Sequence, residues 1–451
     1  MDIQGKRVLV VGAGKSGVAV ARFLLQRGAA VVLTDSKNKE QFNGELDALV
    51  EAGVQPALGS YPRVEPGMFD LVVVSPGVPL HVSPVAAAAR CGIPVLGELE
   101  LAWRYTRAPV VAITGTNGKT TTTALVGEIF RAAGYRTLVG GNIGRPLVGE
   151  VENYGPEDVI VAEVSSFQLE TAHLFRPRVA VILNLTPDHL DRHGNMEGYT
   201  AAKARVFARQ QKGDYTVLNY DDPRVRALAG AVPGEVIFFS RRHNLKEGVF
   251  VHRDRIVIAR GGQTADVLGA GEVAIPGAHN LENALAAVAA ATTLGVSPAV
   301  AARVLRTFAG VPHRLETVAE INGVKYVNDS KGTNPEASMK ALQAFDRPIV
   351  LLAGGRNKGS DFTEFARLVR EKVRVLVVLG ESAGEIERAA RAAGCTEILR
   401  AGDFRQAVLL AHGAARPGDV VLLSPACASW DMFKNFEERG DLFREIVRGL
   451  Q

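Results

Sequence analysis

Residues 109–121 read PVVAITGTNGKTT. A short apolar run leads into a glycine-bearing turn and then into a Lys-Thr pair. A strand that runs through such a turn into a helix is the geometry of a phosphate-binding loop, in which backbone N–H groups and the helix N-terminus face the anion. The usual motif has a glycine five residues before Gly118, where this chain has Ile113, so the loop is a compact variant. We predict that it binds a nucleoside triphosphate.

Each residue type in this loop has an expected role. Glycines permit positive φ and close backbone approach. Lys119 is expected to reach the β- and γ-phosphates, and the Thr120 hydroxyl to bind Mg²⁺. The alternative is a tight turn with a surface lysine. The predicted nucleotide-binding residues of the loop are Gly115, Thr116, Asn117, Gly118, Lys119, Thr120 and Thr121.

Strand-like and helix-like runs alternate on both sides of the loop, which predicts βαβ units and parallel sheets. A chain of 451 residues has room for two to four domains. We predict an α/β protein with a Rossmann-like N-terminal domain (1–104), a central P-loop ATPase-like domain with a mainly parallel sheet (105–311) and a Rossmann-like C-terminal domain (312–451). Residues 240–275 suggest an irregular β excursion, and a last helix is expected over about 430–448.

Composition excludes several classes of protein. Lys and Arg number 52 against 48 acidic residues, an excess too small for a nucleic-acid-binding surface. Three dispersed cysteines predict neither a disulfide framework nor a zinc site, and favour a reducing compartment. No apolar run has the length of a membrane span, and the N-terminus lacks a secretory pattern. We therefore expect a soluble cytoplasmic protein with no membrane insertion and no nucleic-acid partner.

A second glycine loop, GAGKSG at residues 12–17, follows the apolar run 8–11. Asp35 comes 18 residues after Gly17, at the end of the next strand. This spacing is typical of a dinucleotide site, with the pyrophosphate at the helix N-terminus and Asp35 on a ribose hydroxyl. Any nucleoside diphosphate could use the same geometry, and a scaffold without a ligand is the alternative. The turn SPG at residues 75–77 could line the same crevice.

Acids and histidines gather near the central loop. Glu163 ends the strand 159–162, where a carboxylate could bind Mg²⁺ or be a surface charge. Residues 186–193, TPDHLDRH, hold two acids and two histidines within six residues. These could ligate a metal or bind a phosphate. The spacing around Lys203 predicts only a solvated helix lysine.

Three polar turns follow strands in the last third of the chain: VNDSKGTNP at 327–335, the glycine turn 351–356 with Lys358, and SPACAS at 424–429. Lys331 and Thr333 could clamp a carboxylate near the helix that Pro335 begins. Three polar strand ends on one sheet edge indicate an anionic ligand. The alternative is ordinary turn chemistry.

Taken together, these motifs resemble the Mur ligases of bacterial peptidoglycan synthesis. Some of these motifs resemble ones found throughout the Mur ligase superfamily: the phosphate loop, the HNLEN stretch at 279–283 and the pair His313-Arg314. The stretches SSFQLE (165–170), DSKGTN (329–334) and SPACAS are similar to the members that add D-glutamate. The resemblance covers nearly the whole chain, although Lys15-Ser16 and Gly332 match no family signature. It implies an ATP-dependent acid–D-amino-acid ligase, expected to be a monomer, that joins D-glutamate to UDP-N-acetylmuramoyl-L-alanine through an acyl phosphate.

The resemblance also implies roles for single residues, with ATP and two Mg²⁺ ions as cofactors. ATP would be bound by the loop and by Asn283, Arg314 and Asp329. The UDP-sugar would be bound by Gly14, Lys15, Ser16, Asp35, Ser36, Ser75, Pro76, Gly77, Asn142 and His189. Mg²⁺ would be held by Thr120, Glu163, His189 and Lys203, the last as a carbamate. D-Glutamate would be bound by Lys331, Thr333, Lys358, Ser429 and Phe436. The catalytic set would be Lys119, His189 and Lys203.

Other functions stay open at this point. A sister enzyme, either another Mur-type ligase or a folylpolyglutamate synthetase, would differ in the acceptor pocket. An NAD-dependent oxidoreductase would use the loop 12–17 but has no use for residues 115–121. A P-loop switch protein would bind the triphosphate without joining two substrates.

Overall fold

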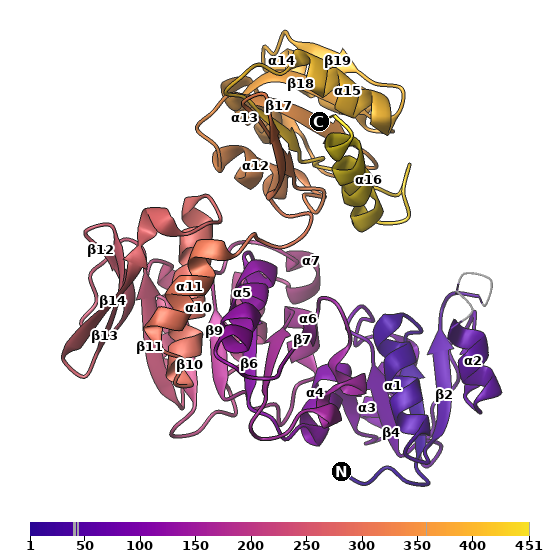
Figure 1. Ribbon diagram of the computed structural model, residues 1–451. Helices are drawn as coiled ribbons and strands as arrows, with labels where there is room; N and C mark the ends of the chain where they lie inside the picture. Colours follow the sequence, from indigo (N-terminus) through magenta and orange to yellow (C-terminus); the bar gives the residue numbers. More distant parts are fainter. Residues whose placement is uncertain (39–41, 43–44, 358, 451) are drawn as a thin grey trace. The chain divides into compact units, whose positions relative to one another are not determined.

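The computed structural model describes residues 1–38, 42, 45–357 and 359–450, and folds them around three separate sheets (Figure 1). The N-terminal sheet is parallel in the order β3-β2-β1-β4-β5. Its strands are β1 Arg7–Val11, β2 Ala30–Asp35, β3 Gln55–Leu58, β4 Leu71–Val74 and β5 Val95–Gly97, and its helices are α1 Lys15–Leu25, α2 Glu45–Glu51, α3 Ser83–Arg90 and α4 Glu98–Tyr105. The chain runs outward from β1 and then returns to β4. The loops after these two strands therefore diverge, which opens a crevice at their carboxyl ends.

The central sheet has the order β14-β13-β12-β11-β10-β9-β6-β8-β7. Its strands are β6 Val110–Thr114, β7 Thr137–Gly141, β8 Val159–Glu163, β9 Val179–Ile182, β10 Tyr215–Asn219, β11 Glu235–Ser240, β12 Gly248–His252, β13 Arg255–Arg260 and β14 Gln263–Gly269. The helices are α5 Lys119–Ala132, α6 Ser166–Glu170, α7 Leu190–His193, α8 Met196–Ala204, α9 Pro223–Ala227, α10 Ala278–Thr293 and α11 Pro298–Thr307, with 3₁₀ turns η2 Leu147–Gly149, η3 Val151–Asn153, η4 Leu228–Ala231 and η5 Ala270–Glu272. The strands from β7 to β12 pair in parallel, and β12, β13 and β14 form antiparallel hairpins at one edge. The β excursion predicted over 240–275 is confirmed: it forms the hairpins β12-β13 and β13-β14, with one register shift at Ile256/Val257.

The C-terminal sheet has the order β15-β16-β20-β17-β18-β19 and is parallel except for β15. Its strands are β15 Glu316–Ile321, β16 Val324–Asn328, β17 Ile349–Gly354, β18 Val373–Leu379, β19 Ile398–Arg400 and β20 Val420–Leu423, and its helices are α12 Pro335–Gln343, α13 Thr363–Lys372, α14 Ala383–Ala392, α15 Phe404–Ala414 and α16 Phe436–Arg448. Helices α12–α14 pack on one face, and α15 and α16 on the other. Because β20 lies between β16 and β17 but its helix covers the opposite face, the loops diverge at the end of β20.

The last helix begins later than the sequence pattern predicts. Asn435 has an extended backbone, and its side chain accepts a hydrogen bond from the backbone N–H of Glu438 at 2.8 Å. An asparagine in this position is an N-cap, which starts the helix at Phe436 instead of near Trp430.

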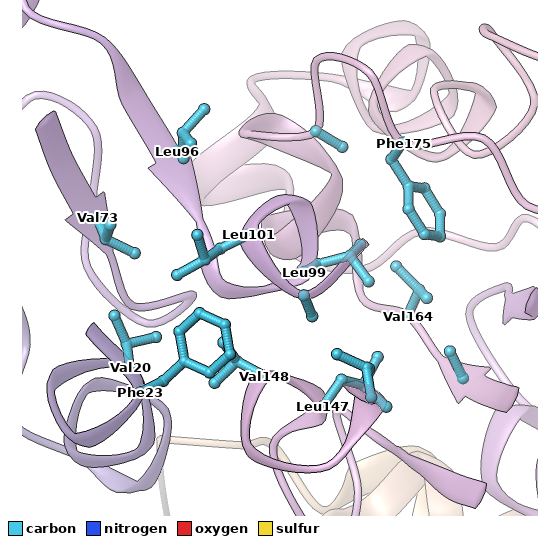
Figure 2. Close-up of a cluster of buried hydrophobic side chains, with 14 of the residues drawn as sticks. Val20, Phe23, Val73, Leu96, Leu99, Leu101, Leu147, Val148, Val164 and Phe175 are labelled. Atoms are coloured by element: carbon cyan, nitrogen blue, oxygen red, sulfur yellow. The ribbon is translucent and has the colours of Figure 1, made fainter. Parts of the chain in front are cut away.

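The chain divides into two compact units: residues 1–272 with 282–306, and residues 273–281 with 307–451. The first two predicted domains, apart from residues 273–281 and 307–311, therefore lie in one unit. They share a hydrophobic cluster in which α1 and α4 both contact η2 (Figure 2). In the same region the buried Glu100 carboxylate accepts three backbone N–H groups, of His173, Leu174 and Phe175, each at 3.0 Å. The predicted boundaries at 104/105 and 311/312 stay predictions.

Candidate functional site

The phosphate loop connects β6 to α5 in the parallel part of the central sheet, where β6 lies between β9 and β8 (Figure 1). Gly115 and Gly118 have φ of +146° and +85°, and a Cβ on Gly118 would overlap the side chain of Asn283. The ammonium of Lys119 donates to the carbonyls of Gly115, at 3.0 Å, and Thr116, at 2.8 Å. The lysine thus lies over its own loop, where an incoming phosphate would meet it.

Residues beyond β9 brace the loop. The largely apolar run 179–185 predicts a strand that reaches Leu185, but β9 ends at Ile182. The next residues bond the loop instead: the Asn184 carbonyl accepts from Thr116 N at 3.0 Å, and its side chain accepts from Asn117 N at 2.8 Å. Loop shape is therefore fixed before any ligand binds.

Glu163 ends β8, beside Ile113 of β6, and is 2% exposed. One carboxylate oxygen accepts from the Asn142 amide at 2.9 Å. The other, Oε2, is buried and has no hydrogen-bond partner within the described part of the chain. An unpartnered buried carboxylate oxygen is costly unless a donor or a cation meets it. The position therefore fits a Mg²⁺ ligand.

Lys203, at the end of α8, is 2% exposed, so the solvated lysine that its spacing predicts is wrong. Its ammonium donates to the Gly115 carbonyl at 2.9 Å and lies 4.7 Å from the ring centroid of Tyr199. Burial, helped by the charge of Lys119, lowers the pKa of Lys203 to about 7, while Asp188 and Glu163 oppose the shift. The charged groups of Lys119, Asp188 and Glu163 therefore lie close enough to Lys203, around the loop, to act on its amine.

His189 starts α7 with a left-handed backbone, φ 51°. Such a conformation costs about 1–2 kcal/mol for a non-glycine residue and is most common at functional sites. Its half-exposed ring lies 4.7 Å from the ring centroid of Phe167, and its Nε2 lies 3.6 Å from the Asp188 carboxylate. The neighbouring His193 ring faces inward, where its Nε2 lies 3.0 Å from the Ser166 hydroxyl. Of the two histidines, His189 is the accessible one.

A cleft of about 540 Å³ opens at the divergence of the loops after β1 and β4. Nine of the ten residues predicted for the UDP-sugar line it; His189 does not. These nine are Gly14, Lys15, Ser16, Asp35, Ser36, Ser75, Pro76, Gly77 and Asn142. Asn142 comes from the central domain and also bonds Glu163, so the cleft and the candidate metal ligand share one side chain.

Two glycines of the N-terminal glycine loop, residues 12–17, are needed for different reasons. A Cβ on Gly17 would overlap the carbonyl of Gly12, so Gly17 is required by the turn itself. A Cβ on Gly14 would meet no protein atom within 4 Å, although the residue lines the cleft. Its missing side chain leaves room for a ligand. Asp35 accepts from the backbone N–H of Ala13 at 2.8 Å and of Lys37 at 3.0 Å, so it braces the loop.

In the second unit, the loops after β16 and β20 meet at Asp329. Its carboxylate accepts from the Ser424 hydroxyl at 2.7 Å and from Leu315 N at 3.3 Å. Burial raises the pKa of Asp329 to about 6, although Ser424 and Arg314 oppose the shift. A Cβ on Gly332 would lie 2.6 Å from the Asp329 carboxylate, which explains the glycine within the Lys-x-Thr motif.

The residues predicted for D-glutamate occupy the same loops. The Lys331 ammonium lies 5.5 Å from the ring centroid of Phe436, which begins α16. Ser429 is buried at the end of the loop after β20, and Thr333 N donates to the Lys331 carbonyl at 2.9 Å. Lys358 lies outside the described residues. Arg314 lies near His279, where its charge adds to burial in lowering the pKa of that histidine to about 4.

Several residues at these sites were missed in the sequence. Asn184 and Tyr199 shape the phosphate loop, the latter with its hydroxyl 3.2 Å from Thr116 Oγ1, and Lys37, Phe42, Tyr61 and Gln168 line the cleft. Most lie outside any short motif, so only their three-dimensional neighbours identify them.

The described residues contain no group of three or more His, Cys, Asp or Glu side chains placed to hold a metal. A nucleotide-bound Mg²⁺ needs only one or two carboxylates, since phosphate oxygens and water complete its shell. None of the helices in the described ranges combines the length and apolarity that spanning a bilayer requires. The three cysteines carry free thiols.

Comparison with known proteins accounts for all three parts of the chain. Residues 6–97 match the Mur ligase MurD-like N-terminal domain, residues 113–291 the Mur ligase middle domain, and residues 313–427 the Mur ligase glutamate ligase domain. Two solved structures share the fold: UDP-N-acetylmuramate-alanine ligase MurC from Thermotoga maritima (TM-score 0.61, 20% identity, 99% of this chain and 100% of that chain) and MurF from Acinetobacter baumannii (0.62, 17%, 98% and 94%).

Other relatives share a much larger fraction of identical residues with this chain. The chain is 64% identical over 450 residues to UDP-N-acetylmuramoylalanine–D-glutamate ligase of Pelotomaculum thermopropionicum, covering 100% of this chain and 99% of that protein. It is 48% identical over 448 residues to the protein of the same name from Desulfitobacterium hafniense (strain Y51), with 99% and 98% covered. Identity at this level over whole chains leaves one conclusion: the protein belongs to the Mur ligase family.

Proposed function

We propose that the protein joins D-glutamate to UDP-N-acetylmuramoyl-L-alanine at the expense of ATP, as a step of peptidoglycan synthesis. Mur ligases use ATP and Mg²⁺. The observation that carries the proposal is the link from the cleft of about 540 Å³, through Asn142, to Glu163 beside the phosphate loop. An NAD-dependent oxidoreductase and a P-loop switch would need no such link. The predicted monomeric state and cytoplasmic location remain predictions.

The reaction divides into two balanced steps. The alanine carboxylate attacks the γ-phosphorus of ATP, the bond to the β-phosphate oxygen breaks, and ADP leaves behind an acyl phosphate. The uncharged amine of D-glutamate then attacks the acyl carbon. Inorganic phosphate leaves from the tetrahedral intermediate, and the amine nitrogen releases a proton.

Charge control is the main task of the protein in the first step, because an anion attacks an anion. Lys119 would lie along the β- and γ-phosphates, and Thr120, Glu163, His189 and carbamylated Lys203 would hold two Mg²⁺ ions. The metal supplies positive charge that the transferred phosphoryl group needs. The cleft would fix the sugar so that the alanine carboxylate is held next to the loop.

A phosphate-release assay tests this function. Release should require UDP-N-acetylmuramoyl-L-alanine, ATP and D-glutamate together, with D-glutamate strongly preferred over L-glutamate. Lys119→Met should lower kcat by at least about a hundredfold, because a fixed positive charge on the phosphoryl group is lost. Faster turnover with another amino acid, or with a folate acceptor, would identify a sister ligase instead.

A further inference from the structure

A pocket of about 190 Å³ lies in the C-terminal unit, at the end of the sheet opposite to Asp329 and Ser424. It opens beside the first residues of β18, whereas Asp329 and Ser424 follow the last residues of β16 and β20, and these strands run parallel. The sites described above use none of the residues that line this pocket. They are Val369, Arg370, Val373, Arg374, Leu376, Gly394, Cys395, Thr396 and Glu397.

Arg370, on α13, is held in the pocket wall by the end of α14. Its Nη1 donates to the carbonyl of Ala393, the residue that follows α14, at 2.8 Å. Gly394 comes next with φ +91°, and a Cβ there would overlap Nη1, so a glycine is what lets the guanidinium lie against this turn. A guanidinium has five N–H donors. Among the described residues, Arg370 has this carbonyl as its acceptor and forms no ion pair, so its charge has no carboxylate partner there.

Arg374, at the start of β18, is the second cation of the pocket. Its Nη2 donates to the carbonyl of Ala414 at 2.7 Å and to the carboxylate of Asp419. Glu397 is the one acid in the lining, and within the described ranges its exposed carboxylate pairs with neither arginine. Asp419 therefore balances the charge of Arg374, whereas the charge of Arg370 stays unbalanced.

Two guanidiniums fixed in one small pocket suit a phosphate group. The planar fork of arginine matches phosphate oxygens, and a side chain already held by backbone carbonyls loses less entropy when it binds an anion. Burial raises the pKa of the Cys395 thiol against the charge of Arg370, so this neighbour is uncharged at neutral pH and does not repel an anion. We propose that the pocket binds a small anion that carries a phosphate group, either inorganic phosphate or a phosphomonoester, between Arg370 and Arg374. The site does not depend on the proposed function.

The Cys395 thiol provides a local readout of binding. It is half-buried in the pocket lining, and the half-buried Cys91 in the N-terminal sheet is an internal control. The full-length protein should be alkylated with iodoacetamide at mildly alkaline pH, where part of each thiol ionises. Mass spectrometry then gives the rate at each cysteine in inorganic phosphate, in glycerol 3-phosphate and in chloride of equal ionic strength.

Phosphate at about ten times its dissociation constant should slow the labelling of Cys395 about tenfold and leave Cys91 unchanged. Protection by glycerol 3-phosphate as well would identify a phosphomonoester group as the ligand, and protection by inorganic phosphate alone would identify the free ion. Equal slowing in chloride, equal slowing at Cys91, or no protection of Cys395 would each overturn the proposal.

Arg370→Gln tests the charge directly. This variant removes a cation that has no carboxylate partner among the described residues, so it should melt close to wild type, whereas its affinity for phosphate should fall about tenfold or more. Arg367→Gln is the matched control, because Arg367 lies on the same helix, is exposed and pairs with Glu364 outside the pocket. Undiminished protection of Cys395 in folded Arg370→Gln, or an equal loss in Arg367→Gln, would show that the pocket does not bind phosphate through Arg370.

Discussion

Burial changes the protonation of the Lys203 amine and so makes it more reactive. With its pKa lowered to about 7, roughly half of its amine is uncharged at neutral pH. The uncharged amine is the form that reacts with CO₂, so carbamate formation should increase as pH rises from about 6 to 8. We predict that phosphate release falls in CO₂-depleted buffer and returns on adding bicarbonate, more completely at the higher pH. Wild-type activity indifferent to bicarbonate, together with a nearly fully active Lys203→Ala, would contradict this.

Glu98 is a second buried ionisable group, and burial raises its pKa from 4.5 to about 7 against the hydrogen bonds from Val148 and Leu147. The native state therefore holds a proton between pH 4.5 and 7 that the unfolded chain releases, and stability falls as pH rises through this window. Glu98→Gln keeps an oxygen for Val148 N but cannot ionise. Its stability relative to wild type should improve by about 2–3 kcal/mol from pH 5 to pH 8.

Chemical denaturation at several pH values measures this difference. Glu100→Gln is the control: the Glu100 carboxylate accepts three backbone N–H groups and the Arg104 guanidinium, so this variant should be less stable than wild type at both ends of the range. Parallel stability profiles for wild type and Glu98→Gln would show that Glu98 does not titrate in this window.

At the scale of single residues, the sequence predicted some residues of the site and missed others. Residues in short motifs, such as Lys119 and the UDP-loop residues, fall at the loop and the cleft because a motif encodes its own local geometry. Lys203 needed the family resemblance, since helix spacing says nothing about which side chain a neighbouring element covers. Tyr199 escaped both kinds of evidence, because its role depends on a contact with Thr116 more than 80 residues away.

The turn between β1 and α1 allows a test on a single element. Gly17→Ala should destabilise the protein by several kcal/mol, because its Cβ would overlap the Gly12 carbonyl and backbone cannot yield cheaply. Gly14→Ala should melt like wild type, since φ is −73° and the Cβ position is empty. UDP binding to Gly14→Ala should nevertheless weaken by about tenfold or more, because the added methyl occupies ligand space.

Differential scanning fluorimetry and titration calorimetry with UDP separate the two effects. Gly14→Ala that binds UDP as tightly as wild type would mean that the ligand does not approach this backbone. Gly17→Ala with an unchanged melting temperature would mean that the turn relaxes without cost.

The sequence predicted which helices and strands form more accurately than it predicted where each of them ends. Alternating apolar runs and helical patterns identified the three α/β domains, because each strand and helix has its own hydrophobic periodicity. Two ends went wrong for local reasons: Asn435 caps the last helix six residues late, and the residues after Ile182 leave the sheet to bond the phosphate loop. The shared packing of the first two domains left no pattern along the chain, since it joins residues far apart in sequence.

For the whole molecule, the two compact units predict the number of unfolding transitions. The N-terminal and central sheets share one hydrophobic cluster, so residues 1–272 and 282–306 should unfold together. Calorimetry should resolve two transitions, not three. UDP should raise the midpoint of one of them only, because the cleft lies entirely in the first unit. A third transition, shifted separately by UDP, would show that the N-terminal sheet unfolds alone.

The cluster around α4 and η2 also limits how this enzyme can be recombined with its relatives (Figure 2). A chimera cut near residue 97 would separate Phe23 and Val20 from Leu147 and Val148, and would have to rebuild a core from two unmatched halves. Exchanging residues 307–451 as a block leaves that cluster whole. If the proposed sites are right, acceptor specificity should move between Mur ligases with residues 307–451, whereas recognition of the UDP-sugar should stay with the central sheet.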